Sequence, residues 1–179
     1  SNFFAPSSRF GEPEDLKRLI NRAHEMGMLV FLDLVHSHAC PNTQEGISQF
    51  DGTDTQFFKE GQAGWHSAWG SRIFNYGKHE VIHFLLSNIK YWQEEFHFDG
   101  FRFDGVTSMI YQNHGLGINF MSYDKYFSLN TDVDAVTYLQ LATELIHAIN
   151  PFAIAIAEDM SGMPGMCLPI RYGGVGFDY

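Results

Sequence analysis

Three carboxylates, Asp33, Asp104 and Glu158, are the residues best suited to chemistry, because each lies at or near the end of a predicted strand. Asp104 follows Arg102 by two positions in the run Phe-Asp-Gly-Phe-Arg-Phe-Asp-Gly. Residues i and i+2 of a strand project from the same face, so a fixed cation is predicted beside this carboxylate. Such a cation lowers the pKa of an aspartate, and an ionised carboxylate suits a nucleophile. The alternative is a structural ion pair at a strand end.

Glu158 has a different predicted environment from Asp104. It follows the apolar run Ile-Ala-Ile-Ala, whose poor solvation is expected to raise its pKa and keep it protonated as an acid. Two carboxyl groups whose pKa values are pushed apart are the usual equipment for cleaving a glycosidic bond. A retaining enzyme of this kind passes through a covalent glycosyl intermediate and needs the two carboxyl groups about 5–5.5 Å apart.

Two histidines follow the first predicted strand, in the run Asp-Leu-Val-His-Ser-His that begins at Asp33. His38 could contact sugar hydroxyls, His36 and His38 could form a metal pair, or both could be loop residues without a role. A metal pair needs further ligands, and the other strand ends offer no histidine, so we expect no metal. Trp65 and Trp69 on the following loop could stack on sugar rings or pin that loop to its own scaffold.

Helices and strands alternate along the chain. Apolar residues at helical spacing predict helices over 13–26, 81–96 and 132–149, the last capped by Thr131. Nearly continuous apolar runs predict buried parallel strands over 28–35, around Phe101 and over 152–157, with a possible fourth strand starting at Gly176.

The connections between these elements are asymmetric in length. The joints from helix to strand are short, whereas the segments from strand to helix, 36–79 and 105–130, are long. In α/β barrels the loops after the strands carry function. We therefore predict an α/β fold that comprises the central βα units of a partial (β/α)8 TIM barrel, since a complete barrel needs about 250 residues. A doubly wound sheet is the alternative, although no glycine-rich phosphate loop follows any strand.

Composition restricts the partners of the chain. Its 179 residues, 45% hydrophobic and 18% charged, suit one globular domain or a large part of one. The formal net charge of −10 argues against nucleic acid. We expect no membrane partner, because no apolar run could span a bilayer and no signal peptide opens the chain. Cys40 and Cys167 have no metal or redox spacing, which favours a reducing compartment.

The strand ends and their loops together resemble glycoside hydrolase family 13, the α-amylase family, and more narrowly its branching enzymes of the glycogen and starch type. The resemblance runs from end to end. It is carried by Ser8-Arg-Phe-Gly11, Val35-His-Ser-His-Ala39, Phe50-Asp-Gly-Thr-Asp54, Phe74-Asn-Tyr-Gly77, the segment 98–109, Ala157-Glu-Asp-Met-Ser-Gly-Met-Pro164 and Gly173-Gly-Val-Gly-Phe-Asp-Tyr179.

This resemblance implies roles for five residues. Asp104 would be the nucleophile and Glu158 the general acid/base, Arg102 would orient Asp104, and Asp33 and His38 would line the subsite of the cleaved glucose. The implied reaction cleaves α-1,4 linkages with retention and transfers the glucan segment to a 6-hydroxyl, which forms an α-1,6 branch. The implied partner is an α-glucan such as glycogen, amylose or amylopectin, with no cofactor, in the cytoplasm or in a plant plastid.

The chain also departs from the family pattern. Ser37 stands where most of the wider family has asparagine, which suits branching enzymes better than plain amylases. The family's fourth region, the first and last barrel strands, the N-terminal carbohydrate-binding module and the C-terminal domain have no counterpart. Residues 1–179 are thus predicted to be the central part of the catalytic barrel domain and inactive alone. The alternatives are an amylase-type hydrolase that uses water, a metal-dependent amidohydrolase barrel and a non-catalytic glucan-binding relative.

Overall fold

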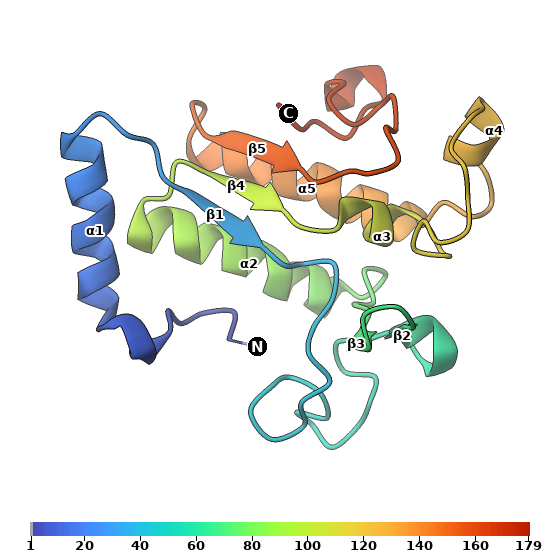
Figure 1. Ribbon diagram of the computed structural model, residues 1–179, viewed down its shortest axis with the longest axis horizontal. Helices are drawn as coiled ribbons and strands as arrows, with labels where there is room; N and C mark the ends of the chain where they lie inside the picture. Colours follow the sequence, from blue (N-terminus) through green and yellow to red (C-terminus); the bar gives the residue numbers. More distant parts are fainter. Residues whose placement is uncertain (1) are drawn as a thin grey trace.

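A three-stranded parallel sheet in the order β1-β4-β5 lies at the centre of the structure (Figure 1). The computed structural model describes residues 2–179. The strands are β1 (Phe31–Leu34), β4 (Gly100–Phe103) and β5 (Ile154–Ala157). All three run in the same direction, with Asp33 opposite Arg102. Their carboxyl ends therefore meet at one edge of the sheet, as predicted.

Each strand follows a long helix, and the three predicted helices are confirmed. They are α1 (Pro13–Glu25), α2 (His79–Phe96) and α5 (Val133–Ile149). The predicted cap of α5 is wrong by one residue, because the Asp132 side chain accepts the N–H of Ala135. Thr131 instead bridges to Tyr111, and its hydroxyl donates to the Tyr126 carbonyl. Within residues 2–179, none of the helices combines the length and apolar character needed to cross a bilayer.

The strands are shorter than predicted because the chain turns before each one. The N–H of Met28 still bonds to Ala23 of α1, and Ala153 bonds back to Asn150. The segment from Gly176 onward is not assigned as a strand. Its backbone nevertheless bonds along the outer edge of β5: the Asp178 N–H donates to the Ala155 carbonyl at 2.9 Å.

The long segments after β1 and β4 carry the remaining short elements. These are the antiparallel pair β2 (Trp65–His66) and β3 (Ser71–Arg72), the helices α3 (Val106–Ile110) and α4 (Tyr123–Tyr126), and the 3-10 turns η1 (Ser8–Phe10), η2 (Gly61–Gly64) and η3 (Ile170–Tyr172). Figure 1 shows α3, α4, β2 and β3 beyond the arrowheads of the parallel strands. The irregular structure therefore gathers at the carboxyl edge of the sheet.

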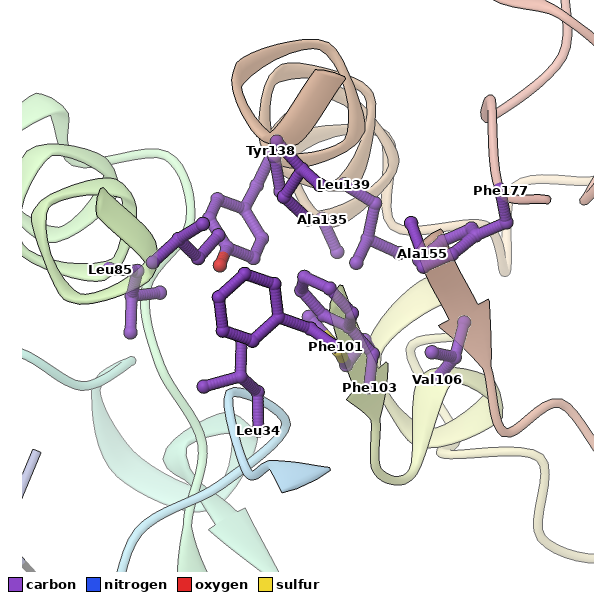
Figure 2. Packing of buried hydrophobic residues seen from close by; sticks show 14 of the residues in the cluster. Leu34, Leu85, Phe101, Phe103, Val106, Ala135, Tyr138, Leu139, Ala155 and Phe177 are labelled. Atoms are coloured by element: carbon purple, nitrogen blue, oxygen red, sulfur yellow. The ribbon is translucent and has the colours of Figure 1, made fainter. Parts of the chain in front are cut away.

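Within residues 2–179, helices cover one face of the sheet and leave the other uncovered. On the covered face the side chains of the strands pack against those of α2 and α5 (Figure 2). The strands contribute Leu34, Phe101, Phe103 and Ala155, and the helices contribute Leu85, Ala135, Tyr138 and Leu139. Residues of alternate position project from the opposite face, where Phe31 and Asp33 are exposed and Arg102, Ile154 and Ile156 are partly exposed. A doubly wound sheet would have helices on both faces, so this arrangement does not match that alternative.

His36 joins the end of β1 to both covering helices. Its side chain is 1% exposed; Nδ1 accepts the hydroxyl of Tyr138 at 2.6 Å and Nε2 donates to Oδ1 of Asn88 at 2.8 Å. The Asn88 amide nitrogen donates to the Phe3 carbonyl, which leaves its oxygen to accept from His36. Burial lowers the pKa of His36 to about 4, although the Asn88 hydrogen bond opposes this shift. His36 is therefore neutral in the folded protein.

Truncation of the central strand should strongly destabilise the fold. Phe103 is fully buried between the sheet and the helices, so Phe103→Ala is expected to reduce the free energy of unfolding by about 3–5 kcal/mol. Phe152→Ala is the control, because this ring is 91% exposed. Urea unfolding followed by circular dichroism measures both. Similar losses for the two variants would contradict the packing described here.

Acidification should destabilise the fold through His36. The pKa is about 6.5 in the unfolded chain and about 4 in the fold, so the unfolded chain binds more protons between these values. The contribution is complete above pH 6.5 and is lost as the pH falls toward 4, by up to about 1.4 kcal/mol per pH unit. His36→Gln should remove the contribution of His36 and so reduce the slope of the free energy of unfolding against pH, whereas the exposed control His83→Gln should leave the slope unchanged. An unchanged slope in His36→Gln would refute the assignment.

Candidate active site

The Arg102 guanidinium lies among three carboxylates that come from all three strands. Its Nη1 is 3.1 Å from Oδ2 of Asp33 and 3.9 Å from Oδ1 of Asp104, and its Nη2 is 3.5 Å from Oε1 of Glu158. The structure thus brings these four residues together at the carboxyl edge of the sheet. They lie on the face of the sheet that no helix covers, with the side chains of Arg102, Asp104 and Glu158 36–38% exposed.

The register of the sheet explains this convergence. Interstrand hydrogen bonds continue one residue past the strand ends: the Asp104 N–H donates to the Leu34 carbonyl at 3.0 Å, and the Glu158 N–H donates to the Phe103 carbonyl at 2.9 Å. Arg102 and Asp104 then project from the same face of β4 by simple alternation. The backbone hydrogen bonds between the strands therefore fix the positions of the main chain from which the Asp104 and Glu158 side chains project.

Gly105 fixes the position of the Glu158 carboxyl group. Its N–H donates to Oε2 of Glu158 at 2.7 Å from a left-handed conformation, with φ of +69°. A Cβ at this position would lie 2.9 Å from Oγ of Ser37 and 3.2 Å from the Trp69 ring. Only glycine combines this backbone conformation with so little space. The turn after β4 thus connects one candidate catalytic group to the other.

The predicted lowering of the Asp104 pKa is wrong. Burial raises the pKa of this carboxyl group, and both the charge of Glu158 and a hydrogen bond with Glu158 raise it further. Arg102 and His38 act in the opposite direction but do not prevail, because Arg102 is shared and lies closer to Asp33 and Glu158 than to Asp104. The interaction with Glu158 therefore favours the protonated form of Asp104.

The two histidines after β1 diverge. His36 enters the core with both ring nitrogens engaged, so it is not free to bind a metal. His38 remains near the carboxylates; burial lowers its pKa, and the charge of Asp104 opposes that shift. Across residues 2–179, no group of three or more histidine, cysteine, aspartate or glutamate side chains could hold a metal ion.

Both loop tryptophans are exposed, Trp65 by 43% and Trp69 by 49%, but their neighbours differ. Along β2, Trp65 is exposed and His66 is buried on the opposite side. Trp69 stacks on His66, with ring centroids 3.9 Å apart and planes at 7°, and lies 4.8 Å from the His38 ring. Trp69 therefore joins its loop to His66 and His38, whereas Trp65 alternates with the buried His66 along β2.

Asp159 connects the loop after β5 to the segment after β4, a role that sequence reasoning missed. Its carboxylate accepts the hydroxyl of Thr107 at 2.6 Å and the N–H groups of Ser161 and Met163 at 2.9 Å. Although burial opposes it, these hydrogen bonds lower the pKa of Asp159. The bond to the N–H two residues on is an Asx turn, and Asp-x-Ser was the available signal. No pattern in the sequence indicated the hydrogen bond between Asp159 and Thr107.

The chemistry open to this cluster is nucleophilic and acid–base chemistry on a neutral substrate. Two carboxyl groups lie within 4 Å of one guanidinium on a partly exposed surface, the guanidinium can stabilise negative charge, and His38 stands beside them. A group that binds this face would meet both carboxyl groups at once.

Comparison with known proteins is informative over the whole chain, although no protein-family model matches it. The chain is 58% identical to a 1,4-alpha-glucan-branching enzyme of Arabidopsis thaliana over 180 residues, which cover 100% of this chain and 22% of the relative. The enzymes of that name from Emericella nidulans and Equus caballus are 57% and 56% identical, again over 100% of this chain and 26% of each relative. The chain thus spans about a quarter of the length of these curated relatives.

Solved structures add a likeness of fold. An alpha-amylase from Geobacillus thermoleovorans aligns with a TM-score of 0.67 and 20% identity, over 99% of this chain and 36% of that one. An Anoxybacillus alpha-amylase aligns with the same TM-score of 0.67 and the same sequence identity of 20%. The fold is therefore that of a segment of an alpha-amylase. The resemblance to the α-amylase family is confirmed, and along its full length the chain is similar in sequence to a segment of 1,4-alpha-glucan-branching enzymes.

Proposed function

We propose that the chain is the central part of the catalytic domain of a 1,4-α-glucan branching enzyme. The observation that carries the proposal is the cluster in which Arg102 lies against Asp104 and Glu158 at the carboxyl edge of the sheet. Its residues stand in motifs within a chain that matches branching enzymes from end to end. A carbohydrate-binding module, the outer barrel strands and a C-terminal domain would belong to the rest of the protein.

The sheet is, in this proposal, three consecutive strands of a (β/α)8 barrel. Parallel strands, a single face covered by helices and long segments at the carboxyl edge all support a barrel wall. The partly exposed face, which carries Phe31, Arg102 and Ile156, would then line the barrel interior. The backbone after Gly176, which bonds along β5, would lead into the next strand.

The proposed reaction has two displacements at one anomeric carbon. Asp104 attacks the anomeric carbon of an internal α-1,4 linkage while Glu158 protonates the departing oxygen. This oxygen leaves with the remainder of the glucan. Glu158, now ionised, removes the proton from a 6-hydroxyl, whose oxygen displaces Asp104 and completes an α-1,6 linkage. Two inversions give net retention. Because Asp104 has a raised pKa, the assignment of these roles rests on position and resemblance rather than on electrostatics.

The other candidate site residues would bind the glucan and orient the two carboxyl groups. Arg102 would hold the carboxyl groups of Asp104 and Glu158 in position, which its contacts at 3.9 and 3.5 Å support. Asp33 and His38 would contact hydroxyls of the cleaved glucose as acceptor and donor. No step of this reaction needs a cofactor or a metal.

The rival functions differ from this one in their products or their requirements. An amylase-type hydrolase would pass the glucosyl group to water and is favoured by the likeness of fold to alpha-amylases. A metal-dependent amidohydrolase is disfavoured because both ring nitrogens of His36 are occupied. A purely glucan-binding protein would not require two carboxyl groups gathered on one guanidinium.

An α-glucan such as glycogen, amylose or amylopectin is the proposed partner, and the net charge of −10 disfavours nucleic acid. The Arabidopsis thaliana relative is named chloroplastic/amyloplastic, which supports a plastid location if the source is a plant. Both cysteines are free, which agrees with a reducing compartment such as the cytoplasm.

Removal of either carboxyl group should abolish branching in the full-length protein. Asp104→Asn removes the attacking oxygen's charge, and Glu158→Gln removes the acid, so each should lower turnover by at least about 10²–10⁴-fold. The measurement is the number of new α-1,6 linkages formed on amylose, scored beside new reducing ends, which report hydrolysis.

The matched control is Glu94→Gln, an exposed carboxylate on α2 at the far edge of the sheet, which should keep full activity. Unfolding temperatures identify any variant that is merely misfolded. Near-normal branching by folded Asp104→Asn or Glu158→Gln would contradict the proposed roles. New reducing ends without new branches in the wild type would favour the hydrolase instead.

A further inference from the structure

Four aromatic rings from two separate loops form a continuous row of contacts, here called the stack, beside the candidate active site. Only His66 and Trp69 are parallel, and the other two pairs are tilted at 34° and 46°. His114, on the segment after β4, lies 4.7 Å from His66 between ring centroids. His66 stacks on Trp69 at 3.9 Å, and Trp69 contacts His38 at 4.8 Å. Of the four rings, only His38 has a place in the proposed reaction. The stack therefore connects the site to two histidines that the reaction does not use.

The Trp69 ring also reaches the turn that holds the two candidate carboxyl groups together. Its Cη2 lies 3.2 Å from the point that a Cβ on Gly105 would occupy, so it packs directly on this residue. The N–H of Gly105 donates to Glu158, and Asp104 is the preceding residue. A single ring thus packs against both His38 and the turn.

We propose that His66 and Trp69 are positioning residues of the active site, which hold His38 and the turn at Gly105 in their working geometry. The proposal rests on the proposed branching function, and it assigns to these two residues no contact with the glucan. His66 supports one face of the Trp69 ring, and Trp69 in turn contacts His38 and the turn at Gly105.

The one ring hydrogen bond of His66 within residues 2–179 requires the neutral ring, and its buried Nε2 has no hydrogen-bond partner there. Its Nδ1 accepts the backbone N–H of Trp69 at 3.2 Å, so this nitrogen carries no proton. Burial, together with the charges of His114 and His38, lowers the pKa of His66 to about 4. His114 is itself held by a bond from Nδ1 to the Ser108 carbonyl at 3.0 Å. The stack therefore remains assembled throughout the neutral pH range.

Displacement of the stack should be visible in the pH dependence of the reaction. His38 and Asp104 act on each other: burial and Glu158 raise the pKa of Asp104, whereas the charges of Arg102 and His38 lower it. If His38 moves away, its part of the lowering effect is lost and only that of Arg102 remains. The pKa of Asp104 then rises, and the acid limb of the activity profile moves to higher pH, because Asp104 must be ionised to attack.

The test uses the full-length protein with Trp69→Ala and His66→Ala, and with the conservative variants Trp69→Phe and His66→Asn. We expect kcat for branching to fall by about 10- to 100-fold in the alanine variants, because small displacements of reacting groups cost this much. KM should stay within about threefold of the wild-type value, and the acid limb of the activity profile should move to higher pH. Trp69→Phe should recover part of the lost kcat and part of the shift of the acid limb. Trp65→Ala, an exposed tryptophan on the same loop, is the matched control and should behave as the wild type.

Each other outcome overturns a defined statement. A raised KM with unchanged kcat in Trp69→Ala would make Trp69 a sugar contact and overturn the positioning role. A lower kcat with an unmoved acid limb, in folded alanine or conservative variants, would reduce the stack to a structural role. If the alanine variants do not fold, the conservative pair decides: wild-type kcat and acid limb in both would overturn the proposal. A wild type without branching activity overturns the proposed function and this inference with it.

Discussion

The site depends on one cation shared by three carboxylates. Asp33, Asp104 and Glu158 would repel one another if they stood on an exposed face without Arg102, and each lies within 4 Å of its guanidinium. Because these side chains are more than a third exposed, water screens the attraction and each pair contributes little to stability. The arrangement is thus explained less by stability than by what the cluster can do to a bound substrate.

The rest of the fold serves to hold this cluster in register. The backbone ladder places Arg102 opposite Asp33, the Gly105 turn fixes Glu158, and the buried ring of His36 ties the end of β1 to two helices. These contacts are short, directional and mostly buried, in contrast to the ion pairs themselves. A stiff scaffold therefore supports a solvent-facing site, which is the arrangement that preorganised catalysis requires.

Sequence patterns predicted those features that local chemistry determines. Helical periodicity located α1, α2 and α5, and the position of charged residues at strand ends placed Asp104 and Glu158 on one face. The direction of the Asp104 pKa was missed because it depends on burial and on Glu158, which is distant in sequence. The stack of His66 on Trp69 was missed for the same reason: no periodicity links a loop ring to the site it supports.

The central claim is that Asp104 is the group that attacks the sugar while Glu158 handles the proton. A fluorinated α-glucosyl fluoride slows the second displacement and traps the glycosyl-enzyme, and peptide mass spectrometry of the full-length protein then locates the attached sugar. The account predicts an adduct on Asp104 and none on Glu158 or Asp33. An adduct on Glu158 would reverse the two roles, as the raised pKa of Asp104 taken alone would suggest, and would contradict the account.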